Sequence, residues 1–248
     1  MGKIFEAFGL SHTYPDGNKA LCEINFYLEE GEKLFVVGAN GSGKSTLLFH
    51  FVGTLLATEG ELLFHGKKIS GGDKAFIANL RRRVGLVFQN PDNQLFMESV
   101  YDDVAFAPRN AGKPQNEIEI CVNEALKKVK IEHLVHRYSW RLSVGEKRLA
   151  ALASVLSMEP EVLVLDEPSA FLDPCARREL MELLFSLDCA QIIATHDLDM
   201  ALDIGSRVIV LDKGKIVADS KIPGILTDEN FLKNHRLELP LSLKKLPR

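Results

Sequence analysis

Eight residues in the first fifth of the chain have the types and spacing needed to hold a phosphate group. They read Gly38-Ala39-Asn40-Gly41-Ser42-Gly43-Lys44-Ser45 and fit the pattern G-x-x-x-x-G-K-[ST]. Glycines let backbone N–H groups turn towards an anion, and a following helix directs its positive end at the same point. Lys44 offers a positive charge to the β- and γ-phosphates, and Ser45 offers a hydroxyl to Mg²⁺. The pattern predicts a nucleoside triphosphate site, with contacts from Asn40, Gly41, Ser42, Gly43, Lys44, Ser45 and Thr46.

A second candidate site is a pair of carboxylates, Asp166 and Glu167, after the apolar run 162–165. Ligand sites of parallel α/β sheets lie at the carboxyl ends of strands. An Asp there is suited to hold Mg²⁺ through water, and a Glu to polarise the attacking water. Read alone, the pair could instead open a helix before Pro168, because acidic residues suit a first helical turn. The phosphate motif elsewhere in the chain favours the strand.

The segment Leu142-Ser143-Val144-Gly145-Glu146 precedes a helical pattern of apolar residues that runs to Leu156. Ser143 and Glu146 form S-x-x-E, a capping box that starts a helix. By itself the segment predicts only a well-capped helix with a buried face.

These side chains must be positioned by strands and helices, and the sequence predicts an α/β fold with a mainly parallel sheet. Short apolar runs predict buried strands, and residues 211–216 predict a tight hairpin. Apolar residues from Leu47 to Leu55 share one side of a helix after the phosphate motif, and residues 90–158 have a helical pattern. The predicted strands are 34–37, 84–88, 162–165, 191–195 and 208–211.

Composition excludes several classes of protein. The 248 residues carry 30 Lys and Arg against 34 Asp and Glu, a net charge of −4, which argues against a nucleic-acid binder. The four cysteines show no CxxC spacing, so neither a zinc nor a redox motif is indicated. No apolar run approaches the length of a membrane span, and the N-terminal residues lack the features of a signal peptide. We therefore expect a cytoplasmic chain, unless a partner holds it at a membrane.

Taken in order, the motifs resemble the ATPase domain of ABC transporters, whose signature reads LSGGQ or LSGGE. The resemblance covers residues 3–218 and implies a P-loop NTPase fold: a RecA-like core with an antiparallel β-subdomain, plus an α-helical signature subdomain. We expect the core at 1–89 and 159–219, the helical subdomain at 90–158 and a C-terminal tail at 220–248, with a short helix near 228–235. Val144 and Phe171 depart from the pattern of the family.

The resemblance also assigns roles and partners. It implies that Tyr14 stacks on adenine, although Tyr14 could be an ordinary turn residue. Gln89 is expected to contact Mg²⁺ with Ser45 and Asp166, and His196 to read the γ-phosphate beside the catalytic Glu167. Two ATPase domains of this family sandwich two ATP molecules, so a second ATPase subunit is expected. That subunit could be a related ATPase, but the chain carries both the signature and Glu167, which favours a homodimer. Residues expected at the signature and D-loop side of that sandwich are Ser143, Gly145, Glu146 and Asp173.

The string FQNPDNQLF at 88–96, followed by DDVAF at 102–106, looks like the ATPases of energy-coupling-factor importers of the cobalt and nickel kind. That implies a transmembrane coupling subunit and a membrane substrate-binding subunit, at the cytoplasmic face of the membrane. Leu95 and Phe96 could pack on such a partner or anchor the loop on their own domain. A vitamin importer, another ABC importer and a soluble ABC protein remain alternatives.

Overall fold

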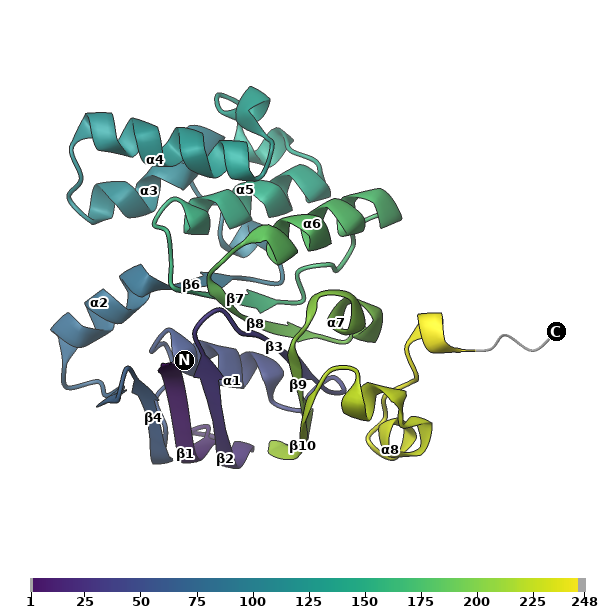
Figure 1. Cartoon of the computed structure of the whole chain (residues 1–248). Helices are drawn as coiled ribbons and strands as arrows, with labels where there is room; N and C mark the ends of the chain where they lie inside the picture. Colours follow the sequence, from purple (N-terminus) through teal and green to yellow (C-terminus); the bar gives the residue numbers. More distant parts are fainter. Residues whose placement is uncertain (1, 245–248) are drawn as a thin grey trace. The chain divides into compact units, whose positions relative to one another are not determined.

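The computed structural model describes residues 2–244 and divides into two compact units (Figure 1). One unit comprises Met1–Arg81 and Asp188–Arg248, and the other comprises Arg82–Leu187. The phosphate motif lies in the first unit and the paired carboxylates lie in the second. The domain bounds expected from the sequence stay a prediction, and the last four residues of the expected tail lie outside the described residues.

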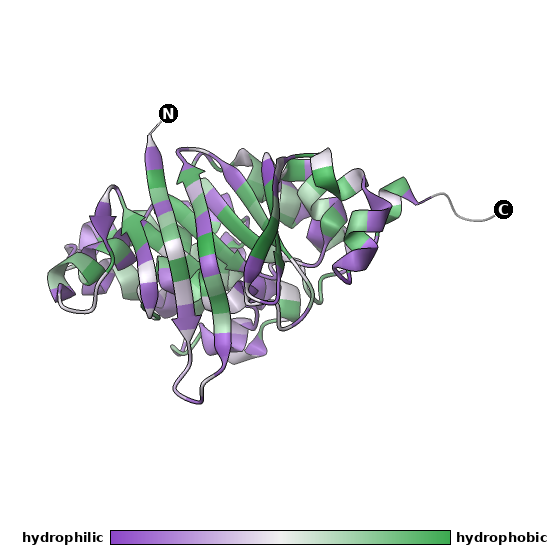
Figure 2. Ribbon diagram, turned by 90° about the horizontal axis from the view of Figure 1, so that it is seen from below, coloured by the Kyte–Doolittle hydropathy of each residue, from purple (hydrophilic) through white to green (hydrophobic). Residues whose placement is uncertain are grey.

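The first unit contains an antiparallel sheet with strand order β2-β1-β4-β5. Burial alternates along β2, and Figure 2 shows hydrophobic and hydrophilic bands alternating along these strands. That alternation is typical of a sheet with one face on the core and the other in solvent. The strands are β1 (Lys3–Thr13), β2 (Lys19–Glu29), β4 (Glu59–Phe64) and β5 (Lys67–Lys68).

The same unit holds four further strands in the order β10-β9-β3-β8. Strand β3 pairs in parallel with β8 and with β9, while β9 and β10 form an antiparallel hairpin. The hairpin turns through Lys213 and Gly214, both with positive φ, as predicted for this turn. The strands are β3 (Lys33–Val37), β8 (Ala190–Thr195), β9 (Arg207–Asp212) and β10 (Lys215–Lys221).

Helix α1 (Lys44–Phe51) follows the phosphate motif, and Phe51 packs edge-on against Phe5 of β1 with ring centroids 4.9 Å apart. The predicted helix extended to Leu55, and this was wrong: the chain leaves the helix at Val52 and turns through Gly53, whose φ is +61°. A glycine in this conformation is a common helix stop. The remaining helical segments of the unit include α7 (Leu198–Ile204), η4 (Gly224–Thr227), α8 (Glu229–Asn234) and η5 (Leu241–Leu243); α2 (Lys74–Arg83) lies at the boundary of the units.

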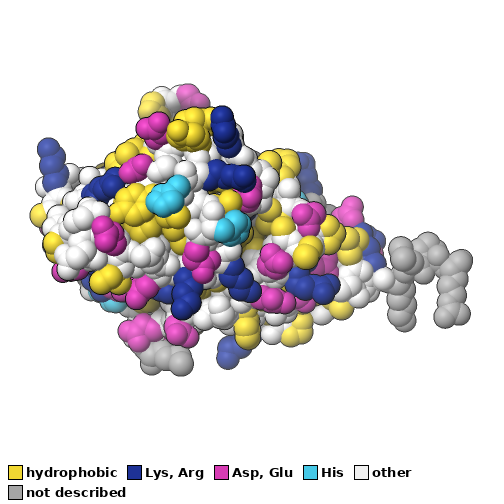
Figure 3. All heavy atoms as spheres, turned by 90° about the horizontal axis from the view of Figure 1, so that it is seen from above, with side chains coloured by type: hydrophobic (Ala, Val, Ile, Leu, Met, Phe, Trp, Pro, Cys, Tyr) yellow, Lys and Arg dark blue, Asp and Glu magenta, His cyan; other side chains and the backbone are white. Residues whose placement is uncertain are grey.

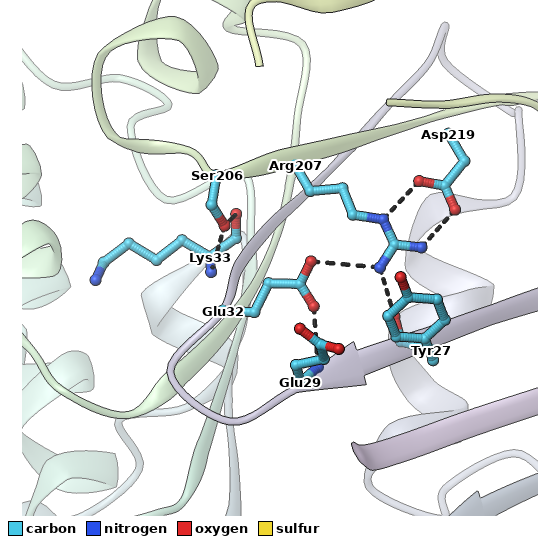
Figure 4. A network of polar contacts seen from close by, with 7 residues as sticks. All are labelled: Tyr27, Glu29, Glu32, Lys33, Ser206, Arg207 and Asp219. Carbon is cyan, nitrogen blue, oxygen red and sulfur yellow. Dashed lines mark hydrogen bonds and ion pairs between the residues drawn. The ribbon is translucent and has the colours of Figure 1, made fainter. Parts of the chain in front are cut away.

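A buried arginine joins three segments of this unit (Figure 4). Arg207, on β9, pairs with Asp219 of β10 and lies 3.3 Å from Glu32, and it donates to the carbonyl of Tyr27 at 3.0 Å. Hydrogen bonding to Asp219 raises the pKa of Arg207, although burial opposes that shift. The guanidinium therefore fastens the edge hairpin to β2.

The second unit has one parallel strand pair, β6 (Val84–Val87) with β7 (Val162–Asp166). Phe88 was predicted to continue β6, and this was wrong: its N–H donates to the side chain of Gln94 at 3.2 Å. Helices α3, α4 and α5 pack against one another, which confirms the predicted helical region. The helices are α3 (Val100–Asn110), α4 (Gln115–Lys128), α5 (Val144–Leu156) and α6 (Pro174–Ser186), with short turns η1 (Pro91–Asn93), η2 (Glu132–Leu134) and η3 (Ser139–Arg141).

Among residues 2–244, no helix has both the length and the apolar character needed to cross a membrane. Apolar side chains nevertheless gather in patches on the face of the molecule seen in Figure 3. In the second unit, Phe96 and Trp140 are 64% and 61% exposed. Single exposed apolar residues are ordinary, whereas clusters point to contact surfaces.

Candidate functional site

The phosphate motif forms the turn between β3 and α1 in the first unit. A Cβ on Gly38 would lie 2.2 Å from the carbonyl oxygen of Leu211, so only glycine fits where the strand enters the turn. Gly43, at the N-cap of α1, has φ +107°, in the region that favours glycine. Lys44 is buried along the turn, and its Nζ donates to the carbonyls of Gly38 at 2.7 Å and Ala39 at 3.3 Å.

Two observations fit this turn to a bound phosphate. The first turn of α1 carries N–H groups with no partner inside the helix, and the positive end of the helix dipole lies there. The Ser42 hydroxyl is buried without a hydrogen-bond partner in the described structure. A buried hydroxyl of this kind costs free energy unless a ligand or water satisfies it. The turn therefore has the donors and the shape of an anion cradle.

Tyr14 lies at the end of β1, beside α1. Its hydroxyl is 3.1 Å from the hydroxyl of Thr46, and its ring meets that of His12 edge-on at 4.7 Å. Thr46 in turn has its carbonyl 2.7 Å from Nδ1 of the buried His50. Burial lowers the pKa of His50. The predicted adenine platform is thus hydrogen-bonded directly to the predicted phosphate-binding helix.

His196 follows β8, the strand next to β3. Val37 and Thr195 are paired residues in these two parallel strands, so the phosphate turn and His196 leave the sheet at the same edge. Asp197 caps α7 by accepting from the N–H of Met200 at 3.0 Å, which fixes the backbone beside the exposed His196. The structure therefore brings His196 to the edge that carries the phosphate motif.

In the second unit, further predicted site residues also follow two neighbouring parallel strands. Val87 of β6 pairs with Leu165 of β7, so Gln89 and the carboxylates Asp166 and Glu167 leave these strands at one edge. Asp166 is the last residue of β7 and Glu167 is buried, with φ +47°. The strand reading of this segment is confirmed, and the alternative of a helix opened by the two acids was wrong. Glu167 adopts a backbone conformation that is uncommon for a residue other than glycine.

The signature segment begins α5 with the predicted capping box. The N–H of Glu146 donates to the Ser143 hydroxyl at 3.3 Å, and the N–H of Ser143 donates to the Glu146 carboxylate at 2.7 Å. The backbone hydrogen bond from Ser143 lowers the pKa of Glu146. Val144 is 52% exposed, so its departure from the usual glycine leaves the cap intact. A Cβ on Gly145 would meet nothing closer than Leu172, at 3.9 Å.

The segment matched to the D-loop precedes α6. Asp173 caps that helix through hydrogen bonds from the N–H groups of Cys175 and Ala176, at 2.9 and 3.0 Å. Phe171, the second departure, is 83% exposed and has φ +64°. The Asp173 carboxylate therefore already has a structural partner, and a role in nucleotide binding stays a prediction.

Sequence reasoning missed three buried polar residues near these predicted sites: His12, His50 and Arg148. Arg148 lies on α5 and donates to three backbone carbonyls of the second unit. Polar residues inside amphipathic segments resemble solvent-facing ones in a sequence, so no pattern marked them.

Comparison with known proteins matches the sequence of the chain to one family. The family model described as ABC transporter matches residues 21–170. A putative ABC transporter ATP-binding protein of Gloeobacter violaceus is 51% identical, over 94% of this chain and 96% of that protein. The energy-coupling factor transporter ATP-binding protein EcfA of Methanocaldococcus jannaschii is 43% identical, over 96% of this chain and 86% of that protein.

Solved structures agree with these sequence matches. The structure of cbiO1 from Clostridium perfringens, described as part of the ABC transporter complex cbiONQ, matches with a TM-score of 0.84 and 39% identity, over 94% of each chain. A dimeric ATP-binding cassette in a post-hydrolysis state, bound to ADP and Pi, matches with a TM-score of 0.82 and 27% identity, over 89% of this chain and all of that one. The P-loop NTPase fold expected from the sequence is confirmed, and the chain belongs to the ABC transporter family as an ATP-binding ATPase.

Proposed function

We propose that this ATPase is the motor subunit of an energy-coupling-factor importer and that it drives uptake of cobalt or nickel ions. The observation that carries the proposal is its 43% identity to EcfA proteins of two organisms, over at least 96% of the chain. The likeness to cbiO1, described as part of the complex cbiONQ, supports the same class. Such a chain works at the cytoplasmic face of the membrane, bound to a coupling subunit and a substrate-binding subunit.

In this proposal each predicted residue has a defined task. When bound, Mg·ATP supplies the γ-phosphoryl group and the metal charge that screens it. Ser45, Gln89 and Asp166 hold the Mg²⁺, Glu167 polarises the attacking water and His196 contacts the γ-phosphate. The backbone of residues 40–46 and the Lys44 ammonium bind the phosphates, and Tyr14 stacks on adenine. The fit of the phosphate turn, with its orphaned Ser42 hydroxyl, supports this assignment.

A second copy of the chain completes each site. Ser143, Gly145 and Glu146 begin a helix whose positive end is suited to the triphosphate bound by the other copy. ATP therefore binds the closed dimer more tightly than the open form, and hydrolysis removes that difference. The dimeric relative bound to ADP and Pi supports this arrangement.

The loop after Gln89 supplies the contact to the membrane partner. Phe96 is 64% exposed and packs edge-on against Phe106 of α3, with ring centroids 4.9 Å apart. The buried carboxylate of Asp103 accepts hydrogen bonds from the N–H groups of Phe96 and Met97, both at 3.0 Å. A hollow of about 390 Å³ adjoins Phe96 and Trp140. A hydrogen-bonded loop that presents an aromatic ring beside a hollow suits a helix inserted by a partner.

The test is purification of the tagged chain from its native membrane in mild detergent, with every co-purifying chain identified by mass. Recovery with a transmembrane coupling subunit and a small substrate-binding subunit is the expected result. Metal uptake by cells, compared with and without the chain, then distinguishes cobalt or nickel from a vitamin cargo. Recovery only as a soluble protein would contradict the transporter role and favour a soluble ABC ATPase.

A further inference from the structure

One buried arginine connects two loops of the second unit. Arg148, on α5, is 2% exposed. Its two terminal nitrogens donate to the carbonyls of Glu167 at 3.3 Å, Gln89 at 2.9 Å and Ala170 at 3.2 Å. The three acceptors come from the loop after β6 and from the turn after β7. A single side chain of the signature helix therefore holds both loops that carry predicted site residues.

Burial of the Arg148 guanidinium costs free energy, so an arginine would be an unfavourable residue here if its side chain only filled space. Burial lowers the pKa of Arg148, and the attraction of the Glu167 carboxylate opposes that shift. The Nε of Arg148 is buried and has no hydrogen-bond partner in the described structure. Burial of a charged group costs free energy unless the charge is paired and hydrogen-bonded. The cost points to a geometric task that an apolar residue does not perform.

The turn that Arg148 contacts has an unusual backbone. Glu167 has φ +47° and Phe171 has φ +64°, and the N–H of Ala170 donates to the Glu167 carbonyl at 3.1 Å. Residues other than glycine hold such angles only where the surroundings impose them. Arg148 binds the carbonyls of Glu167 and Ala170, at the two ends of this hydrogen-bonded turn, and its third bond ties the turn to Gln89.

We propose that Arg148 is a positioning residue that sets Glu167 and Gln89 relative to each other and to the signature helix α5. The planar guanidinium fork directs several donors at fixed angles, whereas a lysine ammonium lacks this geometry. A shift of α5 at its Ser143 end then moves the turn that carries Glu167 and the loop that carries Gln89. The inference rests on the proposed role of Glu167 in polarising water.

The experiment compares Arg148→Lys and Arg148→Met with a matched control, Arg207→Met, in the purified full chain. Arg207 is also a buried arginine, but it ties strands of the first unit together. The readouts are kcat and KM for Mg·ATP, the affinity for a fluorescent ATP analogue, and Tm. A misplacement of about 1 Å costs roughly 100-fold in rate.

For both Arg148 variants we expect kcat to fall about 10- to 100-fold, with affinity for the analogue within about twofold of wild type. For Arg207→Met we expect a lower Tm than that of the wild type, but an unchanged kcat at a temperature well below the unfolding transition. If Arg148→Met does not fold, Arg148→Lys retains a charge and donors and gives the same comparison. A kcat within about twofold of wild type in Arg148→Lys would overturn the inference, as would an equal kcat loss in Arg207→Met.

A double-mutant cycle separates positioning from a general loss of structure. In a Glu167→Gln background, measured by single-turnover hydrolysis, we expect Arg148→Lys to lower the residual rate by less than about twofold. A further 10- to 100-fold loss would show that Arg148 acts independently of Glu167 and would overturn the inference that it positions Glu167. A near-normal rate in Glu167→Gln alone would overturn the proposed role of Glu167, and the inference with it, so the two failures are distinguishable.

Discussion

Replacement of Asp103 by alanine is expected to destabilise the loop that presents Phe96. Asp103 is 4% exposed, and its carboxylate accepts three hydrogen bonds: from the N–H groups of Phe96 and Met97 at 3.0 Å, and from the Ser139 hydroxyl at 2.6 Å. Hydrogen bonds to a charged group contribute about 1.5–3 kcal/mol each, and bonds to one group are not additive. We therefore expect Asp103→Ala to lower the free energy of unfolding by about 4 kcal/mol.

Asparagine at the same position provides the matched variant. Its amide oxygen still accepts from both backbone N–H groups, and its NH₂ group donates to the Ser139 hydroxyl. Only the charge assistance is lost, so Asp103→Asn should cost about 1 kcal/mol. Asp92→Ala is the surface control, because Asp92 pairs with Lys147 at an exposed position and such pairs contribute less than about 1 kcal/mol.

The assay is urea unfolding followed by the fluorescence of Trp140, the chain's one tryptophan, which follows Ser139 directly. At about 2–4 °C per kcal/mol, Asp103→Ala should also lower Tm by about 10 °C. A loss below about 1 kcal/mol in Asp103→Ala would refute the reasoning. An equal loss in Asp103→Asn would show that acceptor geometry is not what stabilises the loop.

Four further predictions concern the nucleotide, the dimer, the membrane contact and pH. Lys44→Ala should abolish ATP binding in a fluorescence titration, because it removes the ammonium that follows the phosphate turn; retained affinity would contradict the site. Glu167→Gln should stop turnover and leave an ATP-dependent dimer visible by size-exclusion chromatography, whereas a strictly monomeric protein at saturating Mg·ATP would contradict the sandwich. Phe96→Glu should prevent assembly with the membrane subunits and leave the circular dichroism spectrum unchanged, and normal assembly would exclude this contact. Burial lowers the pKa of His50, so as pH falls through about 6.5 the unfolded chain takes up a proton before the folded one does, and stability should decline. His50→Gln should flatten that decline in unfolding measured from pH 7.5 to 5, and an unchanged slope would contradict it.

Much of the fold was predictable because its buried parallel strands are short continuous apolar runs. Strands β3, β7, β8 and β9 match the predicted segments to within one residue at each end. The bounds that failed depended on single contacts: the hydrogen bond from Phe88 to the Gln94 side chain, and the turn at Gly53. Strands β1 and β2 were not located by residue, since adjacent apolar residues at 4–5 and 7–8 interrupt the alternation in β1 and the pairing of the two strands contains register shifts.

The candidate site was predictable in part for a different reason. Its motifs are local, so a turn between a strand and a helix can be read from adjacent residues, as at Gly43 and Glu167. Which motifs share an edge depends on strand register, and the pairs Val37 with Thr195 and Val87 with Leu165 appear only in the structure.

Arg148 shows why the supporting residues of a site escape sequence reasoning. Its neighbours in α5 include both a partly exposed lysine and buried alanines, so its position in the helical pattern does not reveal its burial. Its partners are backbone carbonyls, which every residue possesses and which no side-chain pattern marks. The carbonyls of Gln89 and Glu167 belong to loops that lie 59 and 19 residues before and after Arg148 in the sequence, respectively. The requirement for arginine therefore arises only when both loops are folded. The predicted site residues can therefore be recognised in the sequence from their own types and spacing. Arg148, which we infer orients two of them, can be recognised only from its contacts with the folded loops.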